Sequence, residues 1–412
     1  MNYNTTTLPN GLRIIHKPSA SPVVYCGYEI NAGTRDELPG EEGLAHFCEH
    51  TTFKGTRRRR AWHILNCLES VGGDLNAFTN KEDTVYYVAV LRDHTSRAID
   101  LLTDIVFHSQ YPQAEIDKEV EVICDEIESY NDSPAELIYD EFENMVFSGH
   151  PLGHNILGEA SQLRTYQTAD AVRFTRRHYR PENAIFFIYG DVDFKKIVRL
   201  LLKATADLPG GVPVKDTKEN AMPVTPYHPQ ELIVDKATHQ AHVMLGNRAY
   251  DVFDERRIAL YVLNNILGGP GMNARLNLAL RERHGLVYTV ESSMVSYSDT
   301  GLWCVYFGCD PHDVNRCRRL VAKELDRMMQ RPLSATQLAA AKKQLKGQIA
   351  VACDNRESFA LDFGKSFLHY GWEKDVTSLF GHIDALAPED LLKVARDIFA
   401  PDRLTTLIYT GQ

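Results

Sequence analysis

The spacing of apolar residues predicts helices and strands that alternate along the whole chain. The clearest helical stripe lies within residues 112–130, where Ile116, Val120, Ile123 and Ile127 recur at intervals of three and four positions. In the first half we expect helices near 41–54, 60–71, 94–109, 112–130, 134–147, 168–178 and 194–205. The strands expected in this half lie near 11–18, 23–31, 74–79, 84–91 and 183–190.

The second half of the chain repeats this order of elements. We expect its strands near 231–237, 241–247, 288–297, 301–308 and 403–410. Its helices are expected near 253–267, 272–283, 311–330, 334–353, 355–370 and 388–399. A repeat of this kind predicts two similar α+β domains, each a mostly antiparallel sheet covered by helices.

A segment rich in proline and glycine separates the two halves, from Leu208 to Pro226. We therefore predict an N-terminal domain over residues 1–206, a linker over 207–228 and a C-terminal domain over 229–412. The length agrees with this division, because 412 residues exceed what a single hydrophobic core usually supports.

The composition is typical of a globular enzyme. Hydrophobic residues make up 44% of the chain and charged residues 24%, and the net charge of −10 argues against nucleic acid as a partner. The chain has no run of 18 apolar residues and no basic start with an apolar core, so we expect a cytoplasmic protein that does not bind a membrane. The eight cysteines lack C-x-x-C spacing, which agrees with reduced thiols.

The predicted helix 41–54 carries His46, Glu49 and His50 in the pattern H-x-x-E-H. Positions i, i+3 and i+4 of a helix are neighbours, so two imidazoles can bind one ion while the carboxylate lies beside it. This is the inverzincin signature, in which a zinc-bound water is activated and a carboxylate takes its proton. The alternative is a helix with two surface histidines.

Catalytic zinc usually takes three protein ligands, and the acidic helix 112–130 is the obvious source of the third. Four of its seven acids between residues 115 and 128 lie opposite the apolar stripe and are interpreted as a solvated face: Asp117, Glu121, Asp125 and Glu128. Glu115, Glu119 and Glu126 lie together on one flank of the stripe. Periodicity leaves these three candidates open.

Two other histidines, His150 and His154, also have i, i+4 spacing. Pro151 and Gly153 between them interrupt the helix that would align the two imidazoles. We interpret both histidines as turn residues.

Several further segments carry a resemblance to a known family. They are Leu8–Ile14, Gly73–Thr79, Pro151–Gly153 with Gly158, Tyr179–Asn183 and Leu280–Tyr288. With the H-x-x-E-H helix, the chain resembles the inverzincin zinc metallopeptidases that include pitrilysin, insulin-degrading enzyme and the mitochondrial processing peptidase. It is most similar to the short, two-domain bacterial members, which are processing-peptidase-like.

The resemblance implies roles for individual residues. Family members have a glutamate ligand about 76 residues after the second histidine, and Glu126 stands at that distance from His50. The glutamate one heptad earlier, Glu119, would orient a histidine. Asn76, Ala77 and Phe78 match the centre of the family's substrate-binding edge strand. Arg281 and Tyr288 match residues that bind substrate and polarise the scissile carbonyl.

The second repeat lacks the metal ligands. A shift of 222 residues places Gln348 at the position of Glu126 and Ala341 at that of Glu119. We therefore expect the two halves to have different roles. The first half would bind zinc, and the second half would bind the substrate through Arg281 and Tyr288.

We expect a zinc-dependent endopeptidase that cleaves extended or unfolded peptides, with Zn²⁺ on His46, His50 and Glu126 and with Glu49 as general base. One alternative is an inactive structural or partner subunit of a heteromeric peptidase of the family; another is a zinc hydrolase that does not act on peptides. Longer family members carry zinc in their first half and the arginine and tyrosine in their second. This chain is about half that length yet carries both sets of residues. We therefore expect a homodimer with shared active sites, or a heterodimer with a related subunit.

Overall fold

The computed structural model describes residues 2–212 and 226–411. It consists of two compact units, each made of three chain segments. Unit 1 comprises Met1–Glu128, His154–Asp216 and Ala352–Lys374. Unit 2 comprises Ser129–Gly153, Thr217–Val351 and Asp375–Gln412. Most of the predicted linker 207–228 lies outside the described residues.

Unit 1 is built on a six-stranded sheet with the order β1-β2-β6-β3-β5-β4. The strands are β1 (Asn4–Thr7), β2 (Arg13–Pro18), β3 (Val23–Ile30), β4 (Asp74–Thr79), β5 (Thr84–Leu91) and β6 (Ala184–Gly190). Only β2 and β6 pair in parallel, and the other neighbours are antiparallel. Strand β4 lies at the edge of this sheet and pairs with β5.

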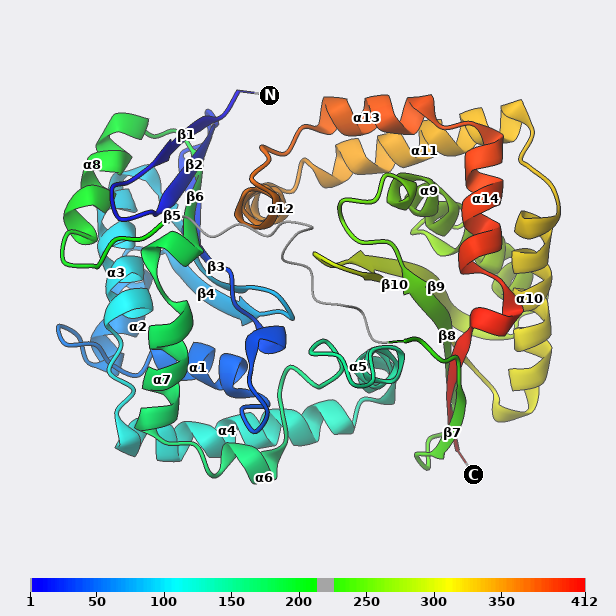
Figure 1. Ribbon diagram of the computed structural model, residues 1–412, viewed down its shortest axis with the longest axis horizontal. Helices are drawn as coiled ribbons and strands as arrows, with labels where there is room; N and C mark the ends of the chain where they lie inside the picture. Colours follow the sequence, from blue (N-terminus) through cyan, green and yellow to red (C-terminus); the bar gives the residue numbers. More distant parts are fainter. Residues whose placement is uncertain (1, 213–225, 412) are drawn as a thin grey trace. The chain divides into compact units, whose positions relative to one another are not determined.

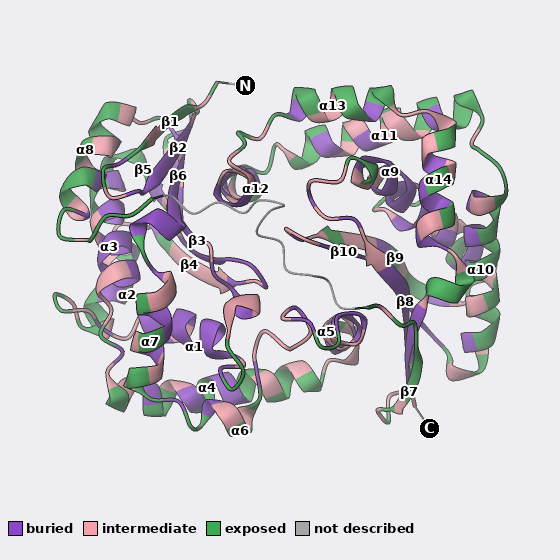
Figure 2. Ribbon diagram, viewed as in Figure 1, coloured by how far each residue is buried: buried purple, intermediate pink, exposed green. Residues whose placement is uncertain are grey.

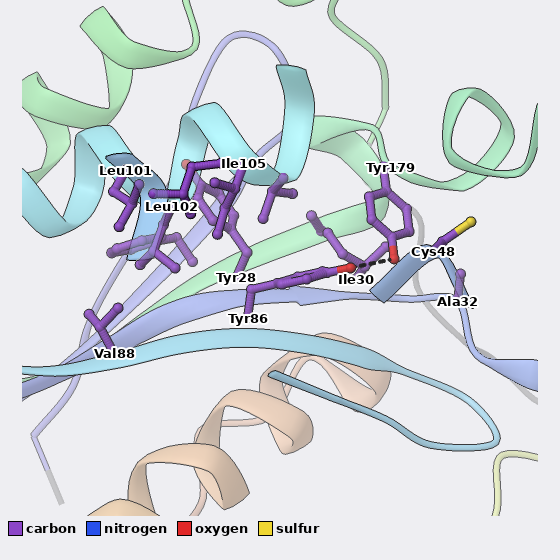
Figure 3. Packing of buried hydrophobic residues seen from close by; sticks show 14 of the residues in the cluster. Tyr28, Ile30, Ala32, Cys48, Tyr86, Val88, Leu101, Leu102, Ile105 and Tyr179 are labelled. Carbon is purple, nitrogen blue, oxygen red and sulfur yellow. Dashed lines mark hydrogen bonds between the residues drawn. The ribbon is translucent and has the colours of Figure 1, made fainter. Parts of the chain in front are cut away.

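One face of this sheet carries the main core of unit 1. Its helices are α1 (Leu44–Thr52), α2 (Ala61–Glu69), α3 (Thr95–His108), α4 (Gln113–Asn131), α6 (Ala160–Leu163), α7 (Thr168–His178) and α8 (Phe194–Ala204). Leu101, Leu102 and Ile105 of α3 pack with Tyr28 of the sheet (Figure 3). Tyr86 and Tyr179 lie in the same core, and their hydroxyl groups share a hydrogen bond of 2.9 Å.

The other face of the unit 1 sheet is covered by α12 (Arg356–Tyr370), a helix from the second half of the chain (Figure 1). Phe359 and Phe363 of this helix pack in a cluster with apolar residues of the sheet: Ile15, Val85, Ile185 and Phe187. Arg13 of β2 donates hydrogen bonds to the carbonyl oxygens of Phe367 at 2.8 Å and Leu368 at 2.9 Å. The helix is therefore an integral part of unit 1.

Unit 2 repeats this architecture around a five-stranded sheet with the order β7-β11-β8-β10-β9. The strands are β7 (Glu231–Asp235), β8 (Ala241–Ala249), β9 (Val287–Ser296), β10 (Gly301–Cys309) and β11 (Thr405–Thr410). Its helices from the second half are α9 (Arg256–Gly268), α10 (Val314–Gln330), α11 (Ala335–Ala352), α13 (Val376–Ala385) and α14 (Pro388–Ile398). Every residue of strand β10, which lies between β8 and β9, is buried (Figure 2).

The second face of the unit 2 sheet is covered by α5 (Pro134–Val146), a helix from the first half of the chain. Ile138 and Phe142 of α5 share a buried cluster with Met244 and Leu407 of the sheet. The Arg248 side chain donates from Nε to the carbonyl oxygen of Val146 at 3.1 Å. The two halves of the chain thus exchange one helix each.

The predicted fold class is confirmed, because each unit is an α+β domain with a mostly antiparallel sheet covered by helices. The compact units differ from the predicted division into 1–206 and 229–412 by the two exchanged segments, 129–153 and 352–374. The apolar stripe of a helix predicts that one side of it is buried, but it does not indicate which sheet the helix covers.

Three local details also differ from the predicted elements. Strand β1 was not predicted, because its sequence Asn-Thr-Thr-Thr has no apolar alternation. Helix α13 was not predicted either, because Thr377, Ser378 and Gly381 have low helix propensity and weaken the helical signal. The helix expected over 272–283 is shorter and contains a π-helical stretch, Asn277–Glu282.

No helix within 2–212 and 226–411 combines the length and apolar character that crossing a bilayer requires.

Candidate metal centre

Helix α1 presents the H-x-x-E-H residues on one side and core residues on the other. Leu44, Phe47 and Cys48 are fully buried in the core of unit 1. His46 and Glu49 are also buried, with 6% and 8% of their surface exposed. The side chains of His46 and Glu49 therefore lie next to a packed core, where electrostatic interactions are stronger than in water.

Glu126 of α4 reaches the two histidines of α1. Its Oε2 atom lies 4.0 Å from Nε2 of His46 and 3.4 Å from Nε2 of His50. One ligand atom from each of the three side chains lies within 4.8 Å of the other two. Tetrahedral ligands at about 2.0–2.1 Å from zinc are separated by about 3.4 Å, so two nitrogens and one carboxylate oxygen at these distances fit a zinc ion after small side-chain adjustments.

Glu119 holds His50 from the opposite side of the imidazole ring. Its Oε1 atom accepts a hydrogen bond from Nδ1 of His50 at 3.1 Å, and its Oε2 atom lies 2.6 Å from Nζ of Lys54. A proton on Nδ1 leaves the lone pair of Nε2 directed toward Glu126. Lys54 was not among the sequence candidates, although its position four residues after His50 was an available signal.

The buried environment separates the pKa values of the two histidines. Burial lowers the pKa of His46 to about 4, and the nearby His50 acts in the same direction. Burial also lowers the pKa of His50, but hydrogen bonds to Glu119 and Glu126 outweigh it and raise that pKa to about 9. Near neutral pH the metal-free group therefore carries a proton on His50, which a metal ion must displace.

Glu49 lies beside the metal-competent group and is connected to strand β4. Burial raises the pKa of its carboxyl to about 7. Thr79, the last residue of β4, donates from Oγ1 to Oε2 of Glu49 at 3.3 Å. The carboxylate is thus held between α1 and the edge strand.

The remaining predicted residues lie on β4 and in unit 2. Asn76, Ala77 and Phe78 are partly buried and pair with β5, which leaves the other side of β4 at the sheet edge. Arg281 lies in the π-helical stretch and Tyr288 in β9. The Arg281 guanidinium carbon lies 5.5 Å from the centre of the Tyr288 ring, and Tyr288 is 80% exposed. The structure brings these two side chains together within unit 2.

The second repeat lacks an equivalent metal group among the described residues. Gln348, predicted to replace Glu126, has an amide oxygen that is buried without a hydrogen-bond partner among the described residues. Gln344 of the same helix exchanges hydrogen bonds with Asn273 at 3.0 Å. Neutral amides therefore line this region of unit 2.

Comparisons with known proteins agree with these features. Residues 13–160 match the model of the insulinase family, peptidase family M16, and residues 167–345 match the model described as the peptidase M16 inactive domain. An uncharacterized zinc protease of Streptomyces coelicolor is 35% identical over 404 residues, covering 95% of this chain and 86% of that protein. The uncharacterized zinc protease YmxG of Bacillus subtilis is 31% identical, covering 98% of this chain and 97% of that protein.

Solved structures show the same fold. A protease from Helicobacter pylori superimposes with a TM-score of 0.90 at 22% identity, covering all of both chains. A peptidase M16 inactive domain from Pseudomonas fluorescens also gives a TM-score of 0.90, at 18% identity, covering 100% of this chain and 98% of that one. Two family models that together match most of the sequence, and relatives that align over nearly all of it, establish that the chain belongs to the insulinase family of peptidases, M16.

Proposed function

We propose that the protein is a zinc-dependent endopeptidase that hydrolyses peptide bonds in extended or unfolded peptides. The observation that carries this proposal is the group of His46, His50 and Glu126, whose ligand atoms lie within 4.8 Å of one another beside the buried Glu49. The naming of several relatives as zinc proteases supports zinc as the metal and peptides as the substrate class.

Each residue of the group has a defined task. His46, His50 and Glu126 would hold Zn²⁺, which when bound supplies Lewis acidity toward water and the scissile carbonyl. Glu49 takes a proton from the attacking water and passes it to the leaving amine. Glu119 keeps His50 in the tautomer that directs Nε2 toward the metal.

Substrate binding is proposed at the free edge of β4. A peptide that adds as a further strand beside Asn76, Ala77 and Phe78 would be held by main-chain hydrogen bonds, with little dependence on its side chains. Extended or unfolded segments expose the unpaired main-chain groups that such a strand needs, which is the reason for expecting them as substrates. Tyr288 would stabilise the oxyanion and Arg281 would support the substrate backbone.

The test is incubation of the protein with a mixed peptide library, with and without a chelator, followed by mass spectrometry. An endopeptidase yields internal cleavages that disappear with chelator and return when zinc is restored. Binding of zinc without any cleavage would favour an inactive partner subunit. Cleavage of small amides and esters but not of peptides would favour a zinc hydrolase of another kind.

We further propose a homodimer in which each active site takes zinc from one subunit and Arg281 with Tyr288 from the other. The proposal rests on the resemblance: longer family members carry zinc in their first half and the arginine and tyrosine in their second, whereas this chain is about half as long and carries both sets, in unit 1 and unit 2. A related subunit could replace one copy. A cytoplasmic location stays a prediction; the eight cysteines, all free, are compatible with it.

Mixing of two inactive variants tests the shared site. Glu49→Gln and Tyr288→Phe subunits that co-assemble place both lesions in one site of the heterodimer and leave the other site intact. Equal mixing should restore up to about a quarter of wild-type activity, because half of the dimers are mixed and each has one of two sites. If the subunits exchange and activity remains at the level of the parents, Arg281 and Tyr288 do not act across subunits.

A further inference from the structure

We propose that Glu37 and His154 are positioning residues that hold the metal-binding helix α1 in register with the edge strand β4. The inference rests on the proposed function, because it concerns the same site. Neither residue belongs to the metal group or to β4. Their contacts connect the beginning of α1 with the turn that ends β4, and both lie in unit 1.

Glu37 takes the place of a capping residue for α1. The N-cap residue Gly43 has no side chain, so the first amide groups of the helix need an acceptor from elsewhere. Oε1 of Glu37 accepts from the amide of Ala45 at 2.7 Å, and Oε2 accepts from the amide of Gly43 at 3.0 Å. Ala45 directly precedes His46. The position of the Glu37 carboxylate therefore sets where the first turn of α1 lies.

Close packing also fixes this end of the helix. Gly43 has a φ of +86°, and a Cβ atom added there would lie 2.8 Å from the Cα atom of Gly158. Because the chain segments approach so closely, α1 has little room to shift at its beginning.

His154 connects the Glu37 carboxylate to the turn between β4 and β5. Its Nε2 atom donates to Oε2 of Glu37 at 2.9 Å, and its carbonyl oxygen accepts a hydrogen bond from Nζ of Lys81. Lys81 lies two residues beyond Thr79, where β4 ends. His154 thus bridges the capping carboxylate and the end of the proposed substrate strand.

The segment that carries Glu37 is bound to the same turn through its backbone. The amide of Thr34 donates to the carbonyl oxygen of Asn80 at 3.2 Å, and the amide of Arg35 donates to that of Lys81 at 2.9 Å. The Arg35 side chain is also paired with Glu82. Together with the hydrogen bond from Thr79 to Glu49, these contacts connect α1 to β4 at both the beginning and the middle of the helix.

A buried carboxylate is a costly way to cap a helix. Only 1% of the Glu37 side chain is exposed, and burial raises the pKa of its carboxyl in spite of three hydrogen bonds. Buried polar contacts contribute little net stability compared with apolar packing, whereas their directional hydrogen bonds specify one geometry. The expected benefit of Glu37 and His154 is therefore the placement of His46 and Glu49 relative to β4.

The experiment compares Glu37→Ala, His154→Leu and His154→Gln with a matched control, Asp193→Ala. Asp193 caps α8 of the same unit by accepting from the amides of Lys195 and Lys196, away from the site. The readouts are zinc affinity by competition with a chromophoric chelator, hydrogen exchange at the Ala45 amide, Tm, and kcat and KM on a peptide substrate.

We expect Glu37→Ala to weaken zinc binding by about tenfold or more and to accelerate exchange at Ala45, because loss of an outer residue that orients ligands typically costs about 10–100-fold. His154→Leu should act in the same direction with a smaller effect. His154→Gln keeps a donor nitrogen at a similar reach and should stay within about twofold of wild type. The Glu37→Ala/His154→Leu double variant should bind zinc as well as Glu37→Ala does. Both substitutions remove the same hydrogen bond between the two side chains, so their effects should not add.

Activity should change mainly through kcat, while Asp193→Ala lowers Tm without changing zinc affinity or kcat. If Glu37→Ala and Asp193→Ala lower Tm alike and neither changes zinc affinity or kcat, Glu37 is an ordinary cap and the proposal is wrong. A wild-type protein without peptidase activity would refute the proposed function, but zinc affinity and exchange at Ala45 would still decide the positioning role.

Discussion

Oε1 of Glu119 lies 3.1 Å from Nδ1 of His50, on the side of the imidazole opposite Glu126. The carboxylate is only 12% exposed in its side chain, and Lys54 at 2.6 Å holds its second oxygen. This arrangement leaves Nε2 as the nitrogen of His50 that would carry a lone pair toward a bound metal. Glu119 is thus placed to control the metal group without reaching it.

Replacement of Glu119 by glutamine should weaken zinc binding by about 10–100-fold, because the amide accepts a weaker hydrogen bond from Nδ1 and no longer pairs with Lys54 as an anion. The measurement is a competition titration with a chromophoric chelator. Glu121→Gln is the control, since Glu121 pairs with Arg164 on the exposed side of α4. Equal affinities of the two variants would remove Glu119 from this role.

Glu126→Gln should lose metal on dialysis, because a neutral amide oxygen is a poor replacement for a carboxylate ligand at 3.4–4.0 Å from the two imidazole nitrogens. Metal content is measured by elemental analysis after dialysis against metal-free buffer. Glu121→Gln should retain the wild-type content under the same treatment. Unchanged zinc in Glu126→Gln would mean that the third ligand is another residue.

Glu49→Gln should keep the zinc and the fold but lower kcat by about 10²–10⁴-fold, the usual contribution of a general base. The glutamine amide can still accept the hydrogen bond from Thr79, so the helix should stay in place. Turnover is measured on a peptide substrate, with zinc content and Tm determined on the same sample. Residual activity above about a tenth of wild type would exclude Glu49 as the base.

The sequence could identify the residues whose spacing is local. His46, Glu49 and His50 lie within a single helical turn and a half, and the structure keeps them on one side of α1. The proposed third ligand is different. Periodicity places Glu115, Glu119 and Glu126 together on one flank, because it describes directions around a helix and not distances to another helix. The resemblance to known peptidases was needed to select Glu126.

The spacing of apolar and polar residues does not predict contacts between segments that are distant in the sequence. The sequence around His154 predicts a turn residue, and nothing in it indicates that the imidazole forms a hydrogen bond with Glu37, 117 positions earlier. The exchanged helices α5 and α12 show the same limit at a larger scale. Their apolar stripes predicted helices correctly, but the partner sheet is a property of the complete fold.

A buried acid outside the site predicts an unusual dependence of stability on pH. Glu29 of β3 is 1% exposed, and neither of its carboxyl oxygens has a hydrogen-bond partner among the described residues. Helix α12 passes so close that a Cβ atom at Gly364 would lie 2.4 Å from Oε1 of Glu29. Burial, and then the nearby Asp83, raise the pKa of the Glu29 carboxyl well above its usual value, although His369 and Lys365 oppose the rise.

The sign of the effect follows from proton binding in the two states. Above a pH of about 4.5 the unfolded chain releases the Glu29 proton while the folded protein keeps it, so the free energy of unfolding falls as pH rises toward the folded pKa. Glutamine imitates the protonated acid and does not titrate. The difference in unfolding free energy, Glu29→Gln minus wild type, should therefore increase with pH above about 5, by at most about 1.4 kcal/mol per pH unit.

Urea unfolding of both proteins at pH 5, 6, 7 and 8 measures this difference. Any fixed cost of burying the amide cancels in the pH dependence, so the slope and not the absolute value is the test. Asp83 provides a contrast: burial opposes its ionisation, but Lys365 and His369 hold its pKa below the usual value, so its contribution to stability is complete above a pH of about 4 and is lost only in acid. A Glu29→Gln difference that is flat over this range would mean that Glu29 is ionised in the folded protein.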